Sequence, residues 1–532
     1  MSWLGSIFGG TGEQAGSWCD RIEPADVKGC EGAVSLIPCA VRRGTRSLAF
    51  AKRIDVLLSG LPVSRLSHLD RSIRDRSSWF REWFGERRLG AVLPKHLPEH
   101  EELFLCLALC HPSGYVRQPA IREAAKRLRR GALSRYAVLA LQLLVLRRND
   151  WVAPVAAGAA AALDQVLVDA PATRWIQALP LVYRLSQFER REHAEFVEAV
   201  KTKAGSAAWA RPLLDGIGSD DRQVSRTATR CALRNTALER SAVVRVALDA
   251  SDPLVRLLAA RAADETEGAD PRQALLARLE ADPFMPVRRE ALRIRAAWFP
   301  ETLRAAYERL LFDPSRALRA QAQAEITKGD GDPAEHYRGH LRDADPADAA
   351  IALLGLAEVG KEADAHLAER FVQAPHARRR AAALRCLARL AGDEYVDTFV
   401  AALLDPSPRV CRTAASALLG RVHRAGIERV LATLDDPPHA HVRRVVLRLL
   451  FESDQWAPLG PLVRAVARGD ETVAPWAASL LGSWFARHRG WTSTPPQAHV
   501  DALRQALDDC GPKLQAGQRS ELEFLLSTLA KS

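Results

Sequence analysis

The chain has 532 residues, which is too long for one compact core and predicts either several domains or a repeat array. Hydrophobic residues make up 48% of it but aromatic residues only 6%, which favours helices packed through small and aliphatic side chains over β-sheets. The nine cysteines are odd in number and sparse, which argues against an extracellular disulfide framework.

The start of the chain, Met1 to Phe8, has neither a basic n-region nor a long apolar stretch, so we expect no secretory signal. The longest apolar run, Trp151 to Leu163, is too short to span a bilayer. We therefore expect a cytoplasmic protein without a membrane span. The high ratio of Arg to Lys suggests a GC-rich bacterial genome.

The formal charge of +11 is unevenly distributed. Residues 1–150 carry 24 Lys and Arg against 15 Asp and Glu, whereas the remaining residues carry 51 against 49. Any electrostatic attraction for an anionic partner is therefore expected in the N-terminal part.

A repeat of about 31 residues is the strongest pattern in the sequence. An Asp-Pro pair or a relative of it recurs in steps of 30, 31, 32, 29, 31 and 31 residues. The marks are Asp252-Pro253, Asp282-Pro283, Asp313-Pro314, Asp345-Pro346, Ala374-Pro375, Asp405-Pro406 and Asp436-Pro437. Asp is a good N-cap and Pro is favoured at the first helical position, so each mark predicts a helix start.

About five residues after most marks stands an aliphatic residue, and four residues later a small or apolar one. The two share a helix face, and the small residue lets a neighbouring helix approach closely. The small or apolar residues are Ala259, Ala291, Ala322, Ala414 and Val446, with weaker copies at Ala120, Ala159, Ala228 and Ala477. Two helix-length segments separate successive marks, so each repeat is a helical hairpin that must stack on its neighbours.

This pattern resembles the HEAT family, especially its short bacterial repeats, over about four fifths of the chain. The family pattern is Asp, then Val-Arg, then Ala on the second helix. The resemblance implies a right-handed all-α solenoid of about 11–12 hairpins. It also implies a structural role for the repeat positions Asp282, Arg288, Asp313, Arg319, Asp405, Arg412, Asp436 and Arg443. We expect a non-repeat region at 1–100, a solenoid at 101–498 and capping helices at 499–532.

Basic residues interleaved with aromatics in the N-terminal part can contact phosphates and stack on bases. The alternative is that the aromatics pack this region onto the first repeat while the basic side chains stay solvated. The candidate contacts are Arg42, Arg43, Arg71, Arg74, Arg81, Arg87, Arg88, Lys126, Arg127, Arg129 and Arg130. A later triplet, Arg378 to Arg380, is a further local contact candidate.

No phosphate-binding loop, dinucleotide fingerprint, nucleophile elbow or HExxH motif is present, and we predict no catalytic residue, metal or cofactor. Cys106 and Cys110 lie one turn apart in an apolar segment, which favours core packing. His439 and His441 flank a turn and are interpreted as turn residues. Some HEAT-like solenoids are DNA glycosylases, a class that needs a carboxylate and aromatics in a basic groove.

The leading hypothesis is a non-enzymatic scaffold that holds a protein partner, as a subunit of a bacterial multi-component system. The alternative is a nucleic-acid-binding subunit that uses residues 42–148. A HEAT-like DNA glycosylase is a third, weaker hypothesis. The sequence leaves the partner's identity and the oligomeric state open.

Overall fold

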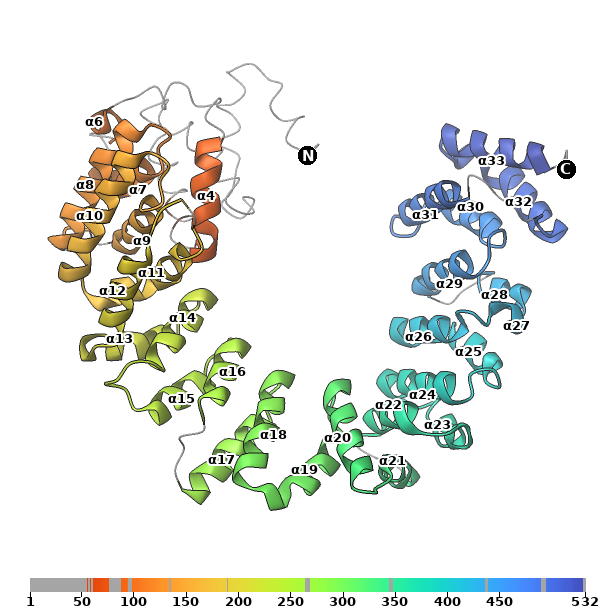
Figure 1. The fold of residues 1–532 in the computed structure, drawn as a ribbon. Helices are drawn as coiled ribbons and strands as arrows, with labels where there is room; N and C mark the ends of the chain where they lie inside the picture. Colours follow the sequence, from red (N-terminus) through yellow and green to blue (C-terminus); the bar gives the residue numbers. More distant parts are fainter. Residues whose placement is uncertain are drawn as a thin grey trace. The chain divides into compact units, whose positions relative to one another are not determined.

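The structure is a computed structural model that describes residues 55, 58, 61–75, 88–93, 98–133, 135–188, 190–263, 268–343, 348–435, 439–488 and 494–529. All regular elements in these ranges are helices (Figure 1). The chain divides into two compact units, an N-terminal unit of Met1–Trp298 and a C-terminal unit of Phe299–Ser532. No described helix is long and apolar enough to cross a lipid bilayer.

In the N-terminal unit, most of the described helices form consecutive antiparallel pairs joined by short turns. α7 packs on α8, α13 on α14, α15 on α16 and α17 on α18. The helices are α4 (Val63–Asp75), α6 (Leu89–Val92), α7 (Glu101–Leu109), α8 (Gly114–Arg129), α9 (Ala137–Arg147), α10 (Ala153–Asp169), α11 (Ala172–Leu185), α12 (Ala194–Ala204), α13 (Ala207–Ile217), α14 (Arg222–Ala232), α15 (Arg240–Leu248), α16 (Pro253–Arg261), α17 (Ala269–Glu280) and α18 (Met285–Trp298), with a 3₁₀ turn at Pro98–His100.

The C-terminal unit continues the same pairing. Its helices are α19 (Leu303–Leu310), α20 (Arg316–Lys328), α21 (Pro333–Arg342), α22 (Ala349–Val359), α23 (His366–Glu369), α24 (Ala377–Leu390), α25 (Val396–Ala402), α26 (Pro408–Leu418), α27 (Val422–Ala425), α28 (Ile427–Ala432), α29 (Ala440–Ser453), α30 (Leu459–Ala467), α31 (Ala474–Arg487), α32 (Gln497–Cys510) and α33 (Ala516–Leu529), with 3₁₀ turns at Pro300–Thr302, Glu362–Asp364 and Gly511–Lys513. The second helices of successive pairs form a row, in which α22 packs on α24, α24 on α26 and α26 on α29.

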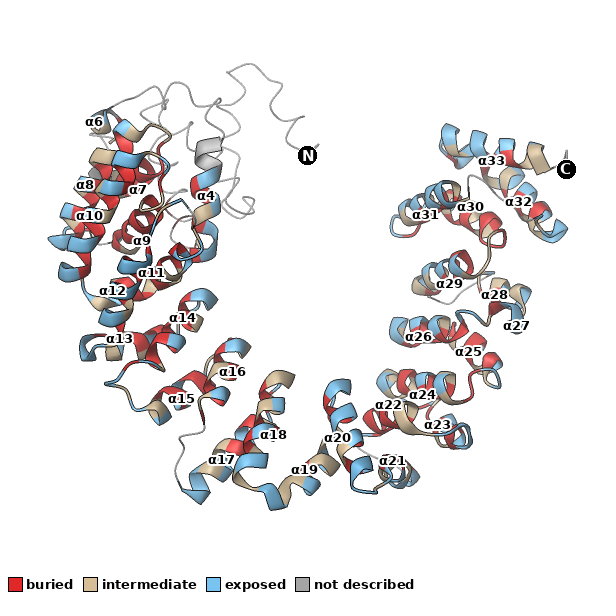
Figure 2. Ribbon diagram, in the orientation of Figure 1, coloured by how far each residue is buried: buried red, intermediate tan, exposed pale blue. Residues whose placement is uncertain are grey.

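The small or apolar residues predicted at the helix contacts are all fully buried. They are Ala120, Ala159, Ala228, Ala259, Ala291, Ala322, Ala414, Val446 and Ala477. Buried residues are found along the packed helices throughout the described chain (Figure 2). The closest approach involves Gly355 of α22, where an added Cβ would lie 2.2 Å from the ring of Tyr337 on α21. The hydroxyl of Tyr337 donates to the carbonyl of Leu311 at 2.9 Å, so the ring cannot move away without losing a buried hydrogen bond.

The Asp-Pro marks stand at the hairpin turns, with one difference from the prediction. Asp252 and Pro253 are the N-cap and first residue of α16, as expected. At Asp282, Asp313 and Asp405 the helix begins three residues later, although each carboxylate accepts the backbone N–H two residues on, as that of Asp252 does. Asp345 and Asp436 lie outside the described residues.

Consecutive hairpins are joined by arginines on one helix that bind a carboxylate in the next repeat. Arg256 donates from Nε and Nη2 to Asp282 at 2.7 and 3.1 Å, and Arg380 donates in the same way to Asp405 at 2.8 and 2.9 Å. Their Nη1 atoms donate to carbonyls five and six residues earlier, in their own turns. We call Arg117, Arg226, Arg256, Arg319, Arg338 and Arg380 the arginine ladder, because each binds a carboxylate at least 25 residues further along the chain.

The side chains at the predicted repeat positions pair across neighbouring repeats as well as within one repeat. Arg288 caps the carbonyls of Asp282 and Pro283, while the carboxylate of Asp282 binds the preceding repeat's Arg256. Arg319 caps its own turn and binds Glu358. Asp282, Arg288 and Arg319 thus contact turns and neighbouring repeats, as the structural role predicted for them requires.

Two arginine interpretations were wrong. In the ladder repeats an arginine holds the position that corresponds to Cys411, directly after Val410. Because the buried Cys411 stands there, Arg412 falls one residue later and is exposed. Arg380 is a ladder residue and not part of a contact triplet. Arg443 is half-buried at the ladder position, and its charge contributes to lowering the pKa of Asp470 after the hydrogen bonds from Thr472.

With hairpins stacked through buried small residues and joined by the ladder, both units are HEAT-like helical solenoids.

Replacing Arg380 by alanine should remove both hydrogen bonds to Asp405 and both caps on the turn carbonyls. Because a mostly buried carboxylate then loses its partner, we expect about 3 kcal/mol less unfolding free energy for the C-terminal unit. The matched control is Arg412→Ala, whose exposed side chain should leave stability within about 0.5 kcal/mol. Urea unfolding with hydrogen exchange at α24 and α26 measures both variants. Equal losses would contradict the ladder's role.

The ladder also predicts a sign for the pH dependence of stability. Burial raises the pKa of Asp405, but the hydrogen bonds from Arg380 and from the backbone N–H of Ser407, together with the charge of Arg380, outweigh burial and lower the pKa. The pKa values of Asp252 and Asp282 are lowered in the same way. A carboxyl whose pKa is lower in the folded state stabilises the protein above its unfolded pKa of about 4 and loses that effect as pH falls further. We expect urea midpoints to drop steeply below about pH 4, and Asp405→Asn to flatten that drop. An unchanged acid limb in Asp405→Asn would refute this assignment.

Candidate binding surfaces

A buried network of four charged side chains fixes α4 against the first hairpins of the N-terminal unit. Arg147 of α9 pairs with Asp70 of α4 and, at 2.8 Å, with Asp150. Asp150 also accepts from Arg117 of α8 at 2.8 Å, and the side chains of Arg117 and Asp150 are fully buried. Two arginines thus neutralise two carboxylates out of contact with water. The network connects α4, α8, α9 and the turn before α10.

A second contact joins α4 to α14 through one carboxylate. Asp221 is the N-cap of α14, where its Oδ1 accepts from the backbone N–H groups of Gln223 and Val224. Its Oδ2 accepts from the backbone N–H of Val63, the first residue of α4, at 2.8 Å. Asp221 therefore caps two helices that are 158 residues apart in sequence, and the negative charge suits both helix N-termini.

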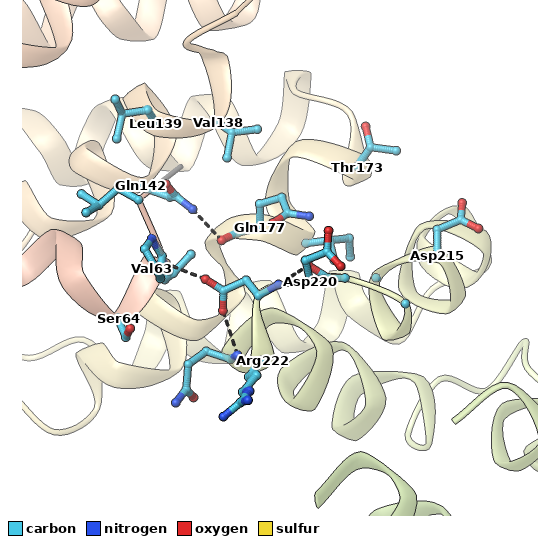
Figure 3. Close-up of a pocket in the computed structure, with 18 of the residues that line it drawn as sticks. Val63, Ser64, Val138, Leu139, Gln142, Thr173, Gln177, Asp215, Asp220 and Arg222 are labelled. Atoms are coloured by element: carbon cyan, nitrogen blue, oxygen red, sulfur yellow. Dashed lines mark hydrogen bonds between the residues drawn. The ribbon is translucent and has the colours of Figure 1, made fainter. Parts of the chain in front are cut away.

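Between α4 and the helices that it meets lies a cleft of about 1380 Å³ (Figure 3). Its apolar lining includes Val138, Leu139 and Ile176, and its polar lining includes the amides of Gln142 and Gln177. The remaining lining residues come from the chain around the start of α4, the turn before α9, Thr173 of α11, the second half of α13, the segment that joins α13 to α14, and the start of α14. We call this space the α4 cleft.

The size and chemistry of the α4 cleft point to a segment of polypeptide. Its volume exceeds the range of about 300–1,000 Å³ typical of small-molecule sites. Gln142 donates to the backbone carbonyl of Gln177 at 2.8 Å, while the Gln177 side chain itself is directed into the cleft (Figure 3). Amide groups beside apolar side chains can bind a peptide backbone and its side chains together.

The predicted N-terminal contact residues are only partly within the described structure. Arg42, Arg43, Arg81 and Arg87 lie outside it. Arg71 and Arg88 are exposed, and Arg74 lies in α4.

In the basic cluster of α8, three of the four side chains are already paired, since Lys126 Nζ lies 3.9 Å from a carboxylate oxygen of Glu123. Arg127 binds Glu101 and Glu123, and Arg129 binds Asp169. Lys126 and Arg130 are exposed and border a pocket of about 550 Å³ shared with α10. The structure thus divides this cluster, and it leaves Arg130 as its better candidate.

The other singled-out residues have structural surroundings. Cys106 and Cys110 are buried, and burial raises the pKa of the Cys106 thiol well above its ordinary value. His441 contacts the carbonyl of Asp405 at 3.0 Å, and its ring stacks on that of His439. Within the described ranges, no three His, Cys, Asp or Glu side chains gather as metal ligands do.

Strongly shifted pKa values often mark catalytic groups, but the described ones here have structural causes. The lowered carboxyl pKa values of Asp252, Asp282 and Asp405 belong to ladder partners. Burial raises the thiol pKa values of Cys386 and Cys411 to about 12, which keeps both sulfurs protonated and unreactive at neutral pH.

No protein-family model and no curated protein matches this sequence. Similar solved structures include a Kap95p complex with RanGDP, at 14% identity over 80% of this chain and 66% of that chain, with a TM-score of 0.35. Importin beta is 13% identical over 98% of this chain and 82% of that chain, with a TM-score of 0.32. A structure of tubulin recruitment by microtubule polymerases with TOG domain arrays is 12% identical over 78% and 97%, with a TM-score of 0.24. This chain spans just under two thirds of the first. The fold assignment rests on the packing and hydrogen bonds described above.

The buried network predicts that α4 depends on Asp70. In Asp70→Ala, α4 loses its pairing with Arg147, while Arg147 keeps Asp150. We expect amide exchange across α4 to accelerate roughly hundredfold, which corresponds to about 3 kcal/mol. Arg65→Ala, an exposed change on the same helix, should leave the exchange unaltered. Hydrogen-exchange mass spectrometry of the full chain checks both, and similar rates in the two variants would refute the assignment.

Proposed function

We propose that this protein is a non-enzymatic binding scaffold that holds a protein partner, and that the α4 cleft receives an extended segment of that partner. The observation that carries the proposal is the cleft itself, a large space with both polar and apolar lining. The buried charge network and the double cap at Asp221 fix α4, so the cleft is formed before any partner arrives. A role as a subunit of a bacterial multi-component system is part of the same proposal.

The distribution of charged and nucleophilic groups supports a binding role over catalysis. The ladder carboxylates are held by arginines, and the buried thiols have raised pKa values. A general base or nucleophile needs a pKa near neutrality and an open neighbouring site. These described groups meet neither requirement.

A nucleic-acid-binding role for residues 42–148 is the second candidate. It is favoured by the exposed Lys126 and Arg130, which border the pocket between α8 and α10. The ion pairs of Arg127 and Arg129 weaken it, because these two charges are already partly neutralised. Phosphate-driven binding would show a steep salt dependence that a partner held in the α4 cleft would not.

A tagged full-length chain should recover a stoichiometric protein partner from the native host, with or without nuclease, at moderate salt. Mass spectrometry identifies the partner, which is then purified for a direct binding measurement. Recovery of nucleic acid, with loss of the associated protein after nuclease treatment, would favour the second candidate instead.

The cleft is tested with Thr173→Arg, which places a long charged side chain at its exposed rim. We expect affinity for the purified partner to fall at least tenfold, because the arginine obstructs the space and desolvates poorly. The matched control is Val168→Arg, which adds the same charge at a position on α10 that is 70% exposed and outside the cleft lining. Equal affinities for both variants would place the partner elsewhere.

A further inference from the structure

The second helices of the C-terminal unit separate charge in a way that the near-neutral composition of residues 151–532 conceals. α24 and α26 contain seven arginines and no Asp or Glu, and α29 adds three arginines and one acid, Glu452. These three helices are consecutive members of the packed row, α24 against α26 and α26 against α29 (Figure 1). Their charges therefore belong to one continuous surface.

The exposed arginines on each of these helices share a face. On α24, Arg378, Arg385 and Arg389 are spaced by seven and four residues, which places them on one stripe. On α26, Arg409 and Arg412 are spaced by three residues. On α29, Arg444 and Arg448 are spaced by four. We call these seven exposed side chains the arginine face.

Five members of the arginine face have no acidic partner among the described residues. These are Arg378, Arg385, Arg389, Arg409 and Arg412. Arg448 pairs with Glu452, and Arg444 lies over the ring of Trp476.

Arginines on the first helices of the same repeats are paired. Arg424 binds Asp393, and Arg429 binds Asp397. The acids of these repeats thus neutralise one side of the stack and the ladder, while the other side keeps its positive charge.

We propose that the arginine face binds the phosphate backbone of double-stranded nucleic acid. The eleven residue steps from Arg378 to Arg389 span about 16 Å at a helical rise of about 1.5 Å per residue. Three adjacent helices at about 8–10 Å between axes cover a further 16–20 Å. A planar, unpaired guanidinium binds phosphate oxygens in a bidentate manner, and a patch of this size contacts several phosphates at once.

The composition of the face favours a duplex backbone over the other polyanions. Single-strand binding uses exposed aromatic side chains that stack on bases, and α24, α26 and α29 contribute no exposed aromatic residue in the described structure. A protein interface normally has an apolar centre. The exposed positions between these arginines are small or polar, and the exposed large apolar residues on either side of α26, Leu404 and Leu419, lie outside that helix. This surface is in the C-terminal unit, so it is independent of the α4 cleft.

The test compares two triple variants of the full-length chain that lose the same charge. Arg385→Ala/Arg412→Ala/Arg444→Ala removes one arginine from each helix of the face. Arg424→Ala/Arg429→Ala/Arg468→Ala removes three exposed arginines on the first-helix side. Fluorescence anisotropy with a 20-base-pair duplex of mixed sequence is measured from 50 to 300 mM salt, with poly(dT) and polyglutamate as competitors. Circular dichroism confirms that both variants fold.

The wild type and the first-helix variant should bind the duplex with the same steep salt dependence. The face variant should bind at least tenfold more weakly, with the slope of log K against log salt reduced by about 0.9 for each arginine lost, or nearly 3 in all. Equal binding by the two variants, or no duplex binding by the wild type, would overturn the proposal. Displacement of the duplex by polyglutamate at equal charge would also overturn it, in favour of an acidic protein segment. These outcomes leave the proposed α4 cleft untouched, since its test uses a separate partner and separate residues.

Discussion

The contact between an arginine of one hairpin and a carboxylate of the next is the constraint on which the repeat stack depends. A hairpin of two short amphipathic helices cannot bury its own apolar face, so its neighbours must be held in register. The ladder arginine does this with one planar group. Its Nη1 caps the carbonyls of its own turn, and its Nε and Nη2 bind the following turn, as Arg256 and Arg380 show. The small buried residues then determine how closely the helices approach.

The N-terminal unit uses the same chemistry for a different purpose. Arg117 still caps its own turn, but its carboxylate partner Asp150 also binds Arg147, which in turn binds Asp70 of α4. The ladder contact has become a buried network that recruits a helix from outside the repeats. Breaking such a network strands a charge away from water, so α4 is firmly held and the cleft beside it is preformed.

The ladder also explains where the remaining charge lies. Many acidic residues lie in the turns, where they cap helices and accept hydrogen bonds from ladder arginines. Asp393, in the turn before α25, and Asp397 of α25 pair with nearby arginines. The exposed faces of α24 and α26 receive arginines with no acids beside them. Their positive face is therefore a product of how the chain stacks, because the sequence places Asp405 only a few residues from Arg409 and Arg412.

The sequence by itself determined the helical-hairpin repeat, its period and the small residues at the helix contacts, because these follow from helix geometry within about 31 residues. It also predicted that Asp282, Arg288 and Arg319 are structural. It misassigned Arg380, because a ladder partner lies 25 or more residues away. It misassigned Arg412, because a one-residue change of register moves a side chain from the turn to the surface. Only the tertiary structure decided which arginines are paired, that Asp221 caps two helices, and that α4 borders a cleft. Each of these depends on residues that meet solely because distant hairpins pack together.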